Sequence, residues 1–497
     1  MAYIASLEAL ASSMQSQTYE IHELGRASGF VVVSHLVYYE NTTGAADFMA
    51  TSLLEAAFVE VLREYPLLAG TMHECKHGRF KVVVDKDNLN LPEFKETQCE
   101  TDFGVLKAAN YAPSELPEGA ATMGRTTDHS RKSPAKLARV HIMRYRDNSG
   151  VAIFVGISHA LVDGYAYNLV MRRWAEICKH LAGSGSLDAK PGRPLSHGCE
   201  LMDDFMQQLA PPAGAFIRHK FIPGGLVSKL LSGRSMKTQV RLIRKMCESG
   251  EFTSHFYFIA QDTIDEMRGA IKEVVPAEQP VSSNDVITAL VNVAMAQSLE
   301  AAAIRDPQSG VLQRVWAALF GAQKPQPKVF VHMGAADIRP RLKIPAADDY
   351  CGSAVMRYAA HVPLDALQGP VTPKMLAIAA TSARKGTDSV DRGYMYTYSS
   401  TIAEEPDCVM RPFIYGGQPP ARLIITSHAR IGHYRSDFGW GVPVWANVIE
   451  DTGTALCYVY PAPPTRNGLV VHMMLPKDIQ DRMRQLPFWK ENVEFIR

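Results

Sequence analysis

The sequence predicts an α/β fold, with mixed α+β sheets covered by helices, in two domains. Three observations support this. Strand-like and helix-like segments alternate before residue 180 and again after residue 250. A chain of 497 residues is long for a single core. Segments rich in Gly and Pro separate the two series. We expect an N-terminal domain over 1–190, a crossover linker over 191–240 and a C-terminal domain over 241–497.

Elements of the first domain follow from local patterns. Apolar residues near i, i+3, i+4 spacing predict a helix over 47–65, which Pro66 ends. The polar turn 146–150 joins two apolar runs and predicts a hairpin. Residues 98–136 are rich in Pro, Gly and charges, which indicates a surface excursion. β-branched and aromatic residues predict strands at 30–39, 79–85, 137–145 and 151–158.

The second domain shows the same alternation. Helical periodicity predicts helices over 262–274 and 282–303, and Ser282, Ser283 or Asn284 is the N-cap of the second. Strands are predicted at 252–260, 328–337, 423–431, 442–450, 455–462 and 468–475.

Composition excludes several classes of function. The net charge is +1. The sequence has no basic stripe with interleaved aromatic residues, the pattern that would indicate a nucleic-acid partner. The eight cysteines form no CxxC pair and no Cys/His cluster at zinc spacing, so we expect reduced thiols and no metal site. The N-terminus lacks a signal-peptide pattern, and no apolar run reaches the ~20 residues of a membrane span. These features predict a cytoplasmic protein without a membrane partner.

A histidine and an aspartate follow the buried run at 151–158, in the sequence HALVDG. The HxxxD pattern occurs three times, starting at His159, His361 and His433. Only His159 lies between an apolar strand and a glycine that opens a helix, a junction where ligands tend to bind. We expect His159 to act as a general base, Asp163 to hold the loop through an ion pair, and Gly164 to allow a sharp turn close to a ligand.

A structural interpretation of the same residues stays open on spacing alone. A histidine at a strand end is often satisfied by local hydrogen bonds, and an acid at the start of a helix is favoured by the helix dipole. The choice between the two interpretations needs a second motif.

That motif is DFGWG, from Asp437 to Gly441. With HALVDG it resembles the BAHD family of acyl-CoA-dependent acyltransferases, especially its fungal members that acylate alcohols. Further segments resemble the family in order and spacing: YPLLAGTM, DGYAYNLVMRRWAEI, SSNDVITALV and ADIRPRLKIPAADDYCGS. The resemblance covers nearly the whole chain, from about residue 30 to the C-terminus.

The resemblance implies a monomer with two chloramphenicol-acetyltransferase-like domains joined by a crossover. It implies a channel between the domains, in which acyl-CoA and a small hydroxylated acceptor meet at the histidine. No cofactor is bound, and acyl-CoA is a co-substrate. The DFGWG loop, including Gly439, is structural in the family. Its aspartate, here Asp437, is expected to pair with Arg339 or Arg341 of the Asp-x-Arg-x-Arg segment.

Two departures from the family pattern concern the acceptor. His428 replaces the tryptophan of the usual Thr-Ser-Trp, so it is either a polar contact to the acceptor or a packing residue. Thr426 matches and is expected near the developing oxyanion. Long inserts between the shared motifs limit any transfer of substrate preference.

These residues together predict a reaction. His159 takes the proton of an alcohol as it attacks the thioester, and Thr426 with backbone amides stabilises the oxyanion. The sequence contains no G-x-S-x-G elbow, which disfavours a hydrolase with a serine nucleophile. No covalent acyl-enzyme is expected, because both substrates would meet in one channel. Ser282 and Ser283 either bind the phosphopantetheine or phosphate region of CoA or only cap their helix. The transferred group is expected to be a short acyl group such as acetyl.

Other activities on the same fold are alternatives. A peptide-synthetase-like condensation enzyme or an N-acyltransferase would form amides, although condensation enzymes usually carry a second histidine where this chain has Ser158. Wax-ester or diacylglycerol acyltransferases also use the double histidine. A non-catalytic small-molecule-binding relative is the third alternative.

Overall fold

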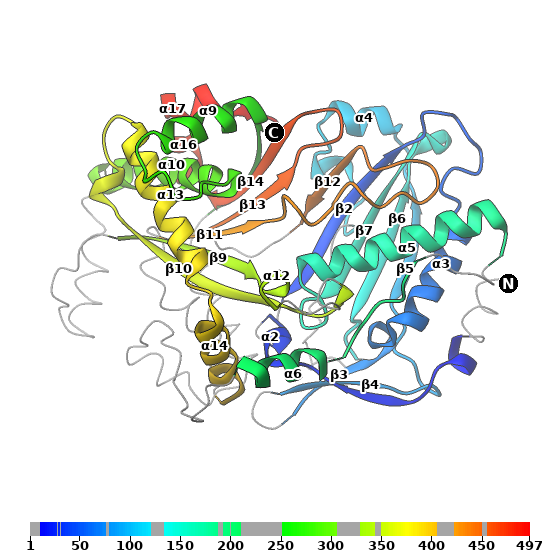
Figure 1. Cartoon of the computed structure of the whole chain (residues 1–497). Helices are drawn as coiled ribbons and strands as arrows, with labels where there is room; N and C mark the ends of the chain where they lie inside the picture. Colours follow the sequence, from blue (N-terminus) through cyan, green and yellow to red (C-terminus); the bar gives the residue numbers. More distant parts are fainter. Residues whose placement is uncertain are drawn as a thin grey trace.

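The computed structural model describes residues 10–26, 28–29, 31–75, 79–120, 134–186, 192–198, 200–209, 251–305, 329–342, 349–404, 422–449 and 455–497. Within these residues the strands form three sheets, of five, seven and three strands. Figure 1 shows the five-stranded and seven-stranded sheets side by side, each with its own helices.

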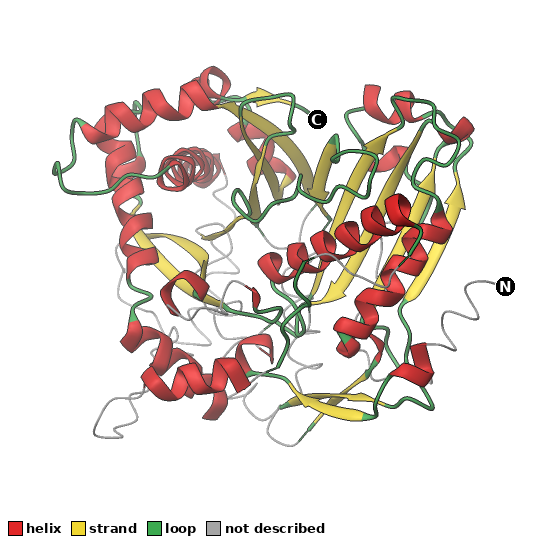
Figure 2. Cartoon of the chain, turned by 45° about the vertical axis from the view of Figure 1, so that its right-hand side comes forward, coloured by secondary structure: helices red, strands yellow, loops and turns green. Residues whose placement is uncertain are grey.

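The five-stranded sheet has the order β12-β2-β7-β6-β5. Every residue of β7 is buried. Its odd-numbered residues from Val151 to Ile157 pack in one core, under helices α3 and α5, and Ala152 and Phe154 pack in another. Figure 2 shows these two helices across one face of the sheet. The elements are β2 (Val32–Glu40), α3 (Thr51–Glu64), β5 (Glu93–Gln98), β6 (Ala138–Arg144), β7 (Gly150–Ser158), α5 (Gly164–Ser184) and β12 (Trp445–Val448).

The seven-stranded sheet has the order β10-β9-β11-β13-β14-β8-β15. Strand β11 is parallel to both of its neighbours, and the other pairs are antiparallel. The strands are β8 (Phe252–Ala260), β9 (Val329–Asp337), β10 (Val355–Pro363), β11 (Arg422–Ser427), β13 (Leu456–Pro461), β14 (Gly468–Pro476) and β15 (Glu494–Phe495). The helices packed with them are α9 (Gln261–Lys272), α10 (Ser283–Arg305), α13 (Pro373–Asp388), α16 (Lys477–Met483) and α17 (Pro487–Asn492).

Smaller elements complete the fold. The three-stranded sheet has the order β1-β4-β3. These strands are β1 (Gln17–Glu20), β3 (Thr71–Glu74) and β4 (Phe80–Val84), and the remaining helices are α2 (Glu23–Arg26), α4 (Phe103–Ala108), α6 (Glu200–Leu209), α12 (Arg339–Leu342) and α14 (Arg392–Glu404). Short 3-10 helices span Pro66–Ala69, Pro113–Glu115, Arg146–Asn148 and Asp365–Leu367.

Strand β12 connects the two halves of the molecule. It comes from the C-terminal half of the chain, yet it pairs antiparallel with β2, Trp445 opposite Tyr38 (Figure 1). Trp445 and Tyr38 also belong to a core shared with Phe256 and Tyr458 of the seven-stranded sheet. The C-terminal half of the chain is therefore joined to the five-stranded sheet by backbone hydrogen bonds, and the two large sheets share a common apolar core.

The α/β class with mixed sheets is confirmed. The predicted hairpin is confirmed as well, because β6 and β7 pair antiparallel with Ala138 opposite Ile157. The excursion over 98–136 contains α4, and 121–133 lie outside the described residues. The linker predicted over 191–240 contains α6, whereas its remainder from 210 lies outside them.

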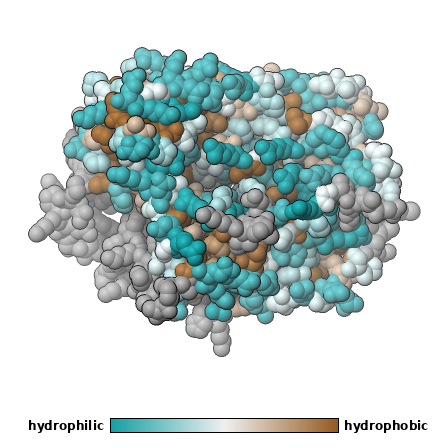
Figure 3. All heavy atoms as spheres, viewed as in Figure 1, coloured by the Kyte–Doolittle hydropathy of each residue, from teal (hydrophilic) through white to brown (hydrophobic). Residues whose placement is uncertain are grey.

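On the face that Figure 3 shows, hydrophilic residues predominate and hydrophobic ones occur in separate groups. Most large apolar side chains belong instead to the buried cores. Among the described residues, no helix combines the length and apolar character needed to cross a bilayer.

Candidate active site

His159 follows the last residue of β7 and precedes α5. Its backbone N–H donates to the carbonyl of Val31 at 2.9 Å, which continues the ladder between β2 and β7 for one residue. The turn closes when the N–H of Leu161 donates to the carbonyl of Ser158, and the hydroxyl of Tyr65 donates to the carbonyl of Leu161. The position of the imidazole is therefore set by backbone bonds on both sides of it.

The imidazole of His159 is neutral near neutral pH. Its Nδ1 is buried without a hydrogen-bond partner among the described residues, while the residue as a whole remains partly exposed. Burial lowers the pKa of His159, the charge of Asp163 opposes this shift, and the positive charge of Arg357 adds to it. A neutral imidazole can accept a proton and has the chemistry of a general base.

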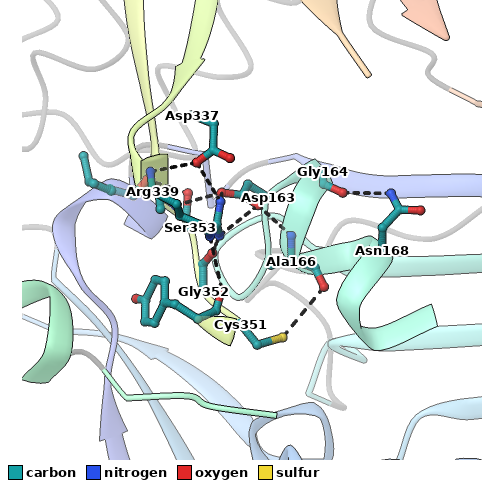
Figure 4. A network of polar contacts seen from close by, with 12 residues as sticks. Asp163, Gly164, Ala166, Asn168, Asp337, Arg339, Cys351, Gly352 and Ser353 are labelled. Atoms are coloured by element: carbon teal, nitrogen blue, oxygen red, sulfur yellow. Dashed lines mark hydrogen bonds and ion pairs between the residues drawn. The ribbon is translucent and has the colours of Figure 1, made fainter. Parts of the chain in front are cut away.

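Asp163 is fully buried and caps α5. One carboxylate oxygen accepts the N–H of Ala166 at 2.8 Å, as an N-cap does. The other accepts the N–H of Ala354 at 2.8 Å, from the far half of the chain. Both oxygens accept from the guanidinium of Arg339, at 2.9 and 3.2 Å. Figure 4 shows the carboxylate between this guanidinium and the first turn of α5.

Arg339 uses its whole guanidinium in this network. Besides Asp163, it donates to a carboxylate oxygen of Asp337 at 3.0 Å and to the carbonyls of Tyr350 and Gly352, at 3.3 and 2.6 Å. Burial alone would raise the pKa of Asp163, but the charge and hydrogen bonds of Arg339 bring it below its ordinary value. Asp163 is thus a charged, fully bonded residue between the two halves, with no oxygen left for a substrate.

Gly164 lies against His428. A Cβ on Gly164 would meet Nε2 of His428 at 3.0 Å, closer than side chains usually approach. Gly164 is not among the glycines with positive φ, and it is the first residue of α5, directly after the turn. Its role in the structure is to leave room for an imidazole from the other half.

The end of β11 therefore approaches the HALVDG turn. Thr426 is partly exposed near the end of this strand, two residues before His428. His428 is buried, and burial followed by the charge of His159 lowers its pKa to about 4. The contact of His428 with Gly164, five residues after His159, brings the segment that carries Thr426 close to the HALVDG turn.

The DFGWG loop contacts the far end of α5. Asp437 forms an ion pair with Lys179 at 2.6 Å and accepts the N–H groups of Gly439 and Gly441 at 2.8 and 2.9 Å. Lys179 lies fifteen residues beyond Gly164 on one helix, so it is about 22 Å from the HALVDG turn. The loop supports the outer end of α5 rather than the neighbourhood of His159.

The expected partner of Asp437 is therefore wrong. Arg339 pairs with Asp163, and Arg341 donates to the carbonyl of Val390. The Asp-x-Arg-x-Arg segment instead supplies the partner of Asp163, through a bond that joins residues 176 positions apart. Gly439 has a φ of +113°, a conformation for which glycine is suited.

Ser282 and Ser283 lie at the start of α10. Ser282 and Asp285 form a reciprocal cap: the hydroxyl of Ser282 accepts the N–H of Asp285 at 3.3 Å, and the carboxylate accepts the N–H of Ser282 at 2.7 Å. Two arginines that the sequence analysis missed reach these hydroxyls, Arg384 at 3.0 Å and Arg268 at 3.3 Å. Helix capping accounts for Ser282, and the two arginine side chains are a feature of this helix start beyond the cap.

A cavity of about 140 Å³ borders the HALVDG turn. It is lined by Ala160 and Leu161 of the turn and by Tyr350 and Cys351, which neighbour the Arg339 network. His159 does not line it. The channel that the family resemblance implies is thus not represented by this cavity.

Comparisons with known proteins agree with the sequence motifs. A model described as the Transferase family matches residues 11–185 and 308–492. O-acyltransferase pigD of Monascus ruber is 28% identical over 164 residues, which are 33% of this chain and 34% of that protein. The match thus spans about a third of the curated relative.

Solved structures are similar in fold. TRI101 of F. sporotrichioides, complexed with coenzyme A and T-2, has a TM-score of 0.68 and 14% identity, over 97% of this chain and 100% of that one. The first condensation domain of the CDA synthetase has a TM-score of 0.55 and 12% identity, over 97% and 99%. The fold is that of two-domain acyltransferases of the chloramphenicol-acetyltransferase type. Because the family model matches well over half of its residues, the chain belongs to the Transferase family.

Proposed function

We propose that the protein transfers a short acyl group from acyl-CoA to a hydroxyl of a small secondary metabolite, with His159 as the general base. The supporting observation is the meeting of two segments. A neutral, partly exposed imidazole follows β7, and His428, two residues after Thr426 of β11, lies against the glycine five residues later. A base and hydroxyl from opposite halves are what this reaction needs.

In this mechanism, Nε2 of His159 accepts the proton of the acceptor hydroxyl while the oxygen attacks the thioester carbonyl. The resulting oxyanion is stabilised by the hydroxyl of Thr426 and backbone N–H groups, a contribution of about 3 kcal/mol for each donor. The C–S bond then breaks, and the departing CoA thiolate takes from His159 the proton that came from the acceptor hydroxyl. Both substrates react directly, so no acyl-enzyme forms.

Asp163 and Arg339 are positioning residues in this proposal. Their ion pair holds the HALVDG turn against the C-terminal half, and neither has a free polar atom for the reaction. Arg268 and Arg384 lie beside Ser283 and Ser282 at the start of α10, where they also pair with Asp265 and Asp285. We assign this helix start to the phosphates of CoA, with Ser283 as the available hydroxyl.

The acceptor class rests on the relatives. The name of pigD states O-acyl transfer, and TRI101 has been solved with T-2 and with deoxynivalenol. A hydroxylated natural product is therefore the proposed acceptor. Amide formation is the second candidate, since the condensation domain shares the fold.

The test is thiol release from a panel of acyl-CoAs, with hydroxylated natural products and matching amines as acceptors. We expect turnover with alcohols, and an H159A variant that folds but loses more than a thousandfold in rate. H361A is a matched control, because His361 carries the same HxxxD pattern on β10 and is exposed. Full turnover by H159A, or turnover only with amines, would contradict the proposal.

A further inference from the structure

Three histidines meet at the boundary between the two halves, next to the candidate site. His35 lies on β2, and His428 and His433 lie in the segment after β11. One ring nitrogen of each lies within 4.8 Å of the others. The residues are 1%, 9% and 2% exposed. We refer to these residues as the three-histidine cluster.

Most nitrogens of the cluster are buried without a hydrogen bond. Nε2 of His35, Nδ1 of His428 and both nitrogens of His433 have no partner among the described residues. Buried polar atoms in folded proteins are nearly always bonded, so unpaired nitrogens facing one another require an explanation. Ring stacking does not provide it: the rings of His428 and His433 lie 5.4 Å apart, but stacking leaves in-plane lone pairs unused.

A neutral imidazole carries one nitrogen lone pair that can bind a cation, and one ring nitrogen of each of the three residues lies within 4.8 Å of the others. Neutral imidazole is a preferred ligand of Zn²⁺ and related divalent transition metals.

The spacing is close to that of a metal site. Three atoms at most 4.8 Å apart enclose a point at most about 2.8 Å from each, whereas Zn–N bonds are about 2.1 Å. Rotations that move each nitrogen by about 0.7 Å would complete the coordination, and a water would occupy a fourth position. Tyr460 packs edge-on against His428 and His433, at 6.0 and 5.5 Å, and limits alternative positions of the rings.

We propose that His35, His428 and His433 bind one divalent transition metal ion of the Zn²⁺ type, which links the five-stranded sheet to the end of β11. The ion would be structural. It would fix His428 against Gly164 and so fix the strand that carries Thr426. The sequence pattern predicted no metal site, because His35 is nearly 400 residues from the other two ligands and the three histidines lack the short ligand spacing of a zinc motif.

The test uses untagged full-length protein stripped with EDTA and titrated with Co²⁺ and with Zn²⁺. We expect one Co²⁺ per chain, with the intense visible bands of a four-coordinate nitrogen site, and an increase in Tm on the order of 5 °C with excess Zn²⁺. H433Q and H35Q are expected to lose both signals.

H472Q is the matched control. His472 is a buried histidine of the same interface, but its two nitrogens are bonded to Ser254 and Tyr460. It should keep the Co²⁺ bands. Wild-type protein without stoichiometric Co²⁺, bands that survive H433Q, or bands lost equally in H472Q would each overturn the proposal. These readouts do not involve turnover, so their failure leaves the acyltransferase proposal intact.

Discussion

Arg339 donates to both carboxylate oxygens of Asp163, at 2.9 and 3.2 Å, with the two side chains 1% and 0% exposed. This pair joins the turn that carries the candidate base to the opposite half of the molecule. The pair also makes the stability of the fold depend on both residues, because a buried charge is tolerated only while its partner is present.

Removing the charge of Asp163 should therefore destabilise the protein strongly. D163N leaves the guanidinium of Arg339 buried with only one carboxylate nearby, that of Asp337. We expect a loss of about 3–5 kcal/mol in the free energy of unfolding. Denaturant unfolding monitored by tryptophan fluorescence measures it.

D437N is the matched comparison. Asp437 pairs with Lys179, whose side chain is 58% exposed, so water screens this bond. A loss of about 1 kcal/mol or less is expected from the ion pair. Equal losses for the two variants would show that burial does not distinguish the pairs.

The space that Gly164 leaves for lack of a side chain should be needed by His428. G164A brings a methyl group within 3.0 Å of Nε2 of His428 and is expected to cost about 1–3 kcal/mol. H428A should relieve that clash, so the double variant loses less than the sum of the single ones. G183A in the same helix meets nothing within 4 Å and should be neutral or slightly stabilising.

The acid limb of the pH–rate profile should lie below pH 6.5. Burial and Arg357 lower the pKa of His159, while Asp163 raises it, and the net shift is downward. The base is therefore unprotonated at neutral pH, and kcat/KM falls only in more acidic solution. R357Q removes the nearby positive charge and should move the limb toward higher pH. A limb above 6.5 in the wild-type protein would contradict the assigned environment of the base.

Stability should fall in acid because buried histidines fold in the neutral form. Burial lowers the pKa of His332 to about 4. The unfolded chain binds this proton near pH 6.5, so stability is complete above that value and decreases as pH falls toward 4. The loss from this one residue is about 3 kcal/mol. H332Q should reduce the slope of unfolding free energy against pH between 6.5 and 4.

Local sequence patterns were sufficient to predict the fold class and the β6–β7 hairpin. The apolar run at 151–158 and the polar turn before it were enough to give the β6–β7 hairpin, because register there depends on adjacent residues. The two short motifs gave the family. The place of His159 at the end of β7 followed from the same reasoning.

Relationships between distant residues were beyond such patterns. The partner of Asp437 was wrong, and β12 was expected among strands of its own half, because neither bond leaves a local signal. The three-histidine cluster was missed for the same reason. What brings these residues together is the packing of two sheets, which depends on the whole chain.

The pairing of β12 with β2 has a consequence for expression. A fragment that ends before Trp445 keeps β2 but exposes its backbone N–H and C=O groups along one side. Such an unprotected sheet margin is a template for intermolecular association. The two halves of the enzyme are therefore expected to resist separate production: the N-terminal piece should aggregate alone and become soluble only when the segment containing Trp445–Val448 is supplied with it.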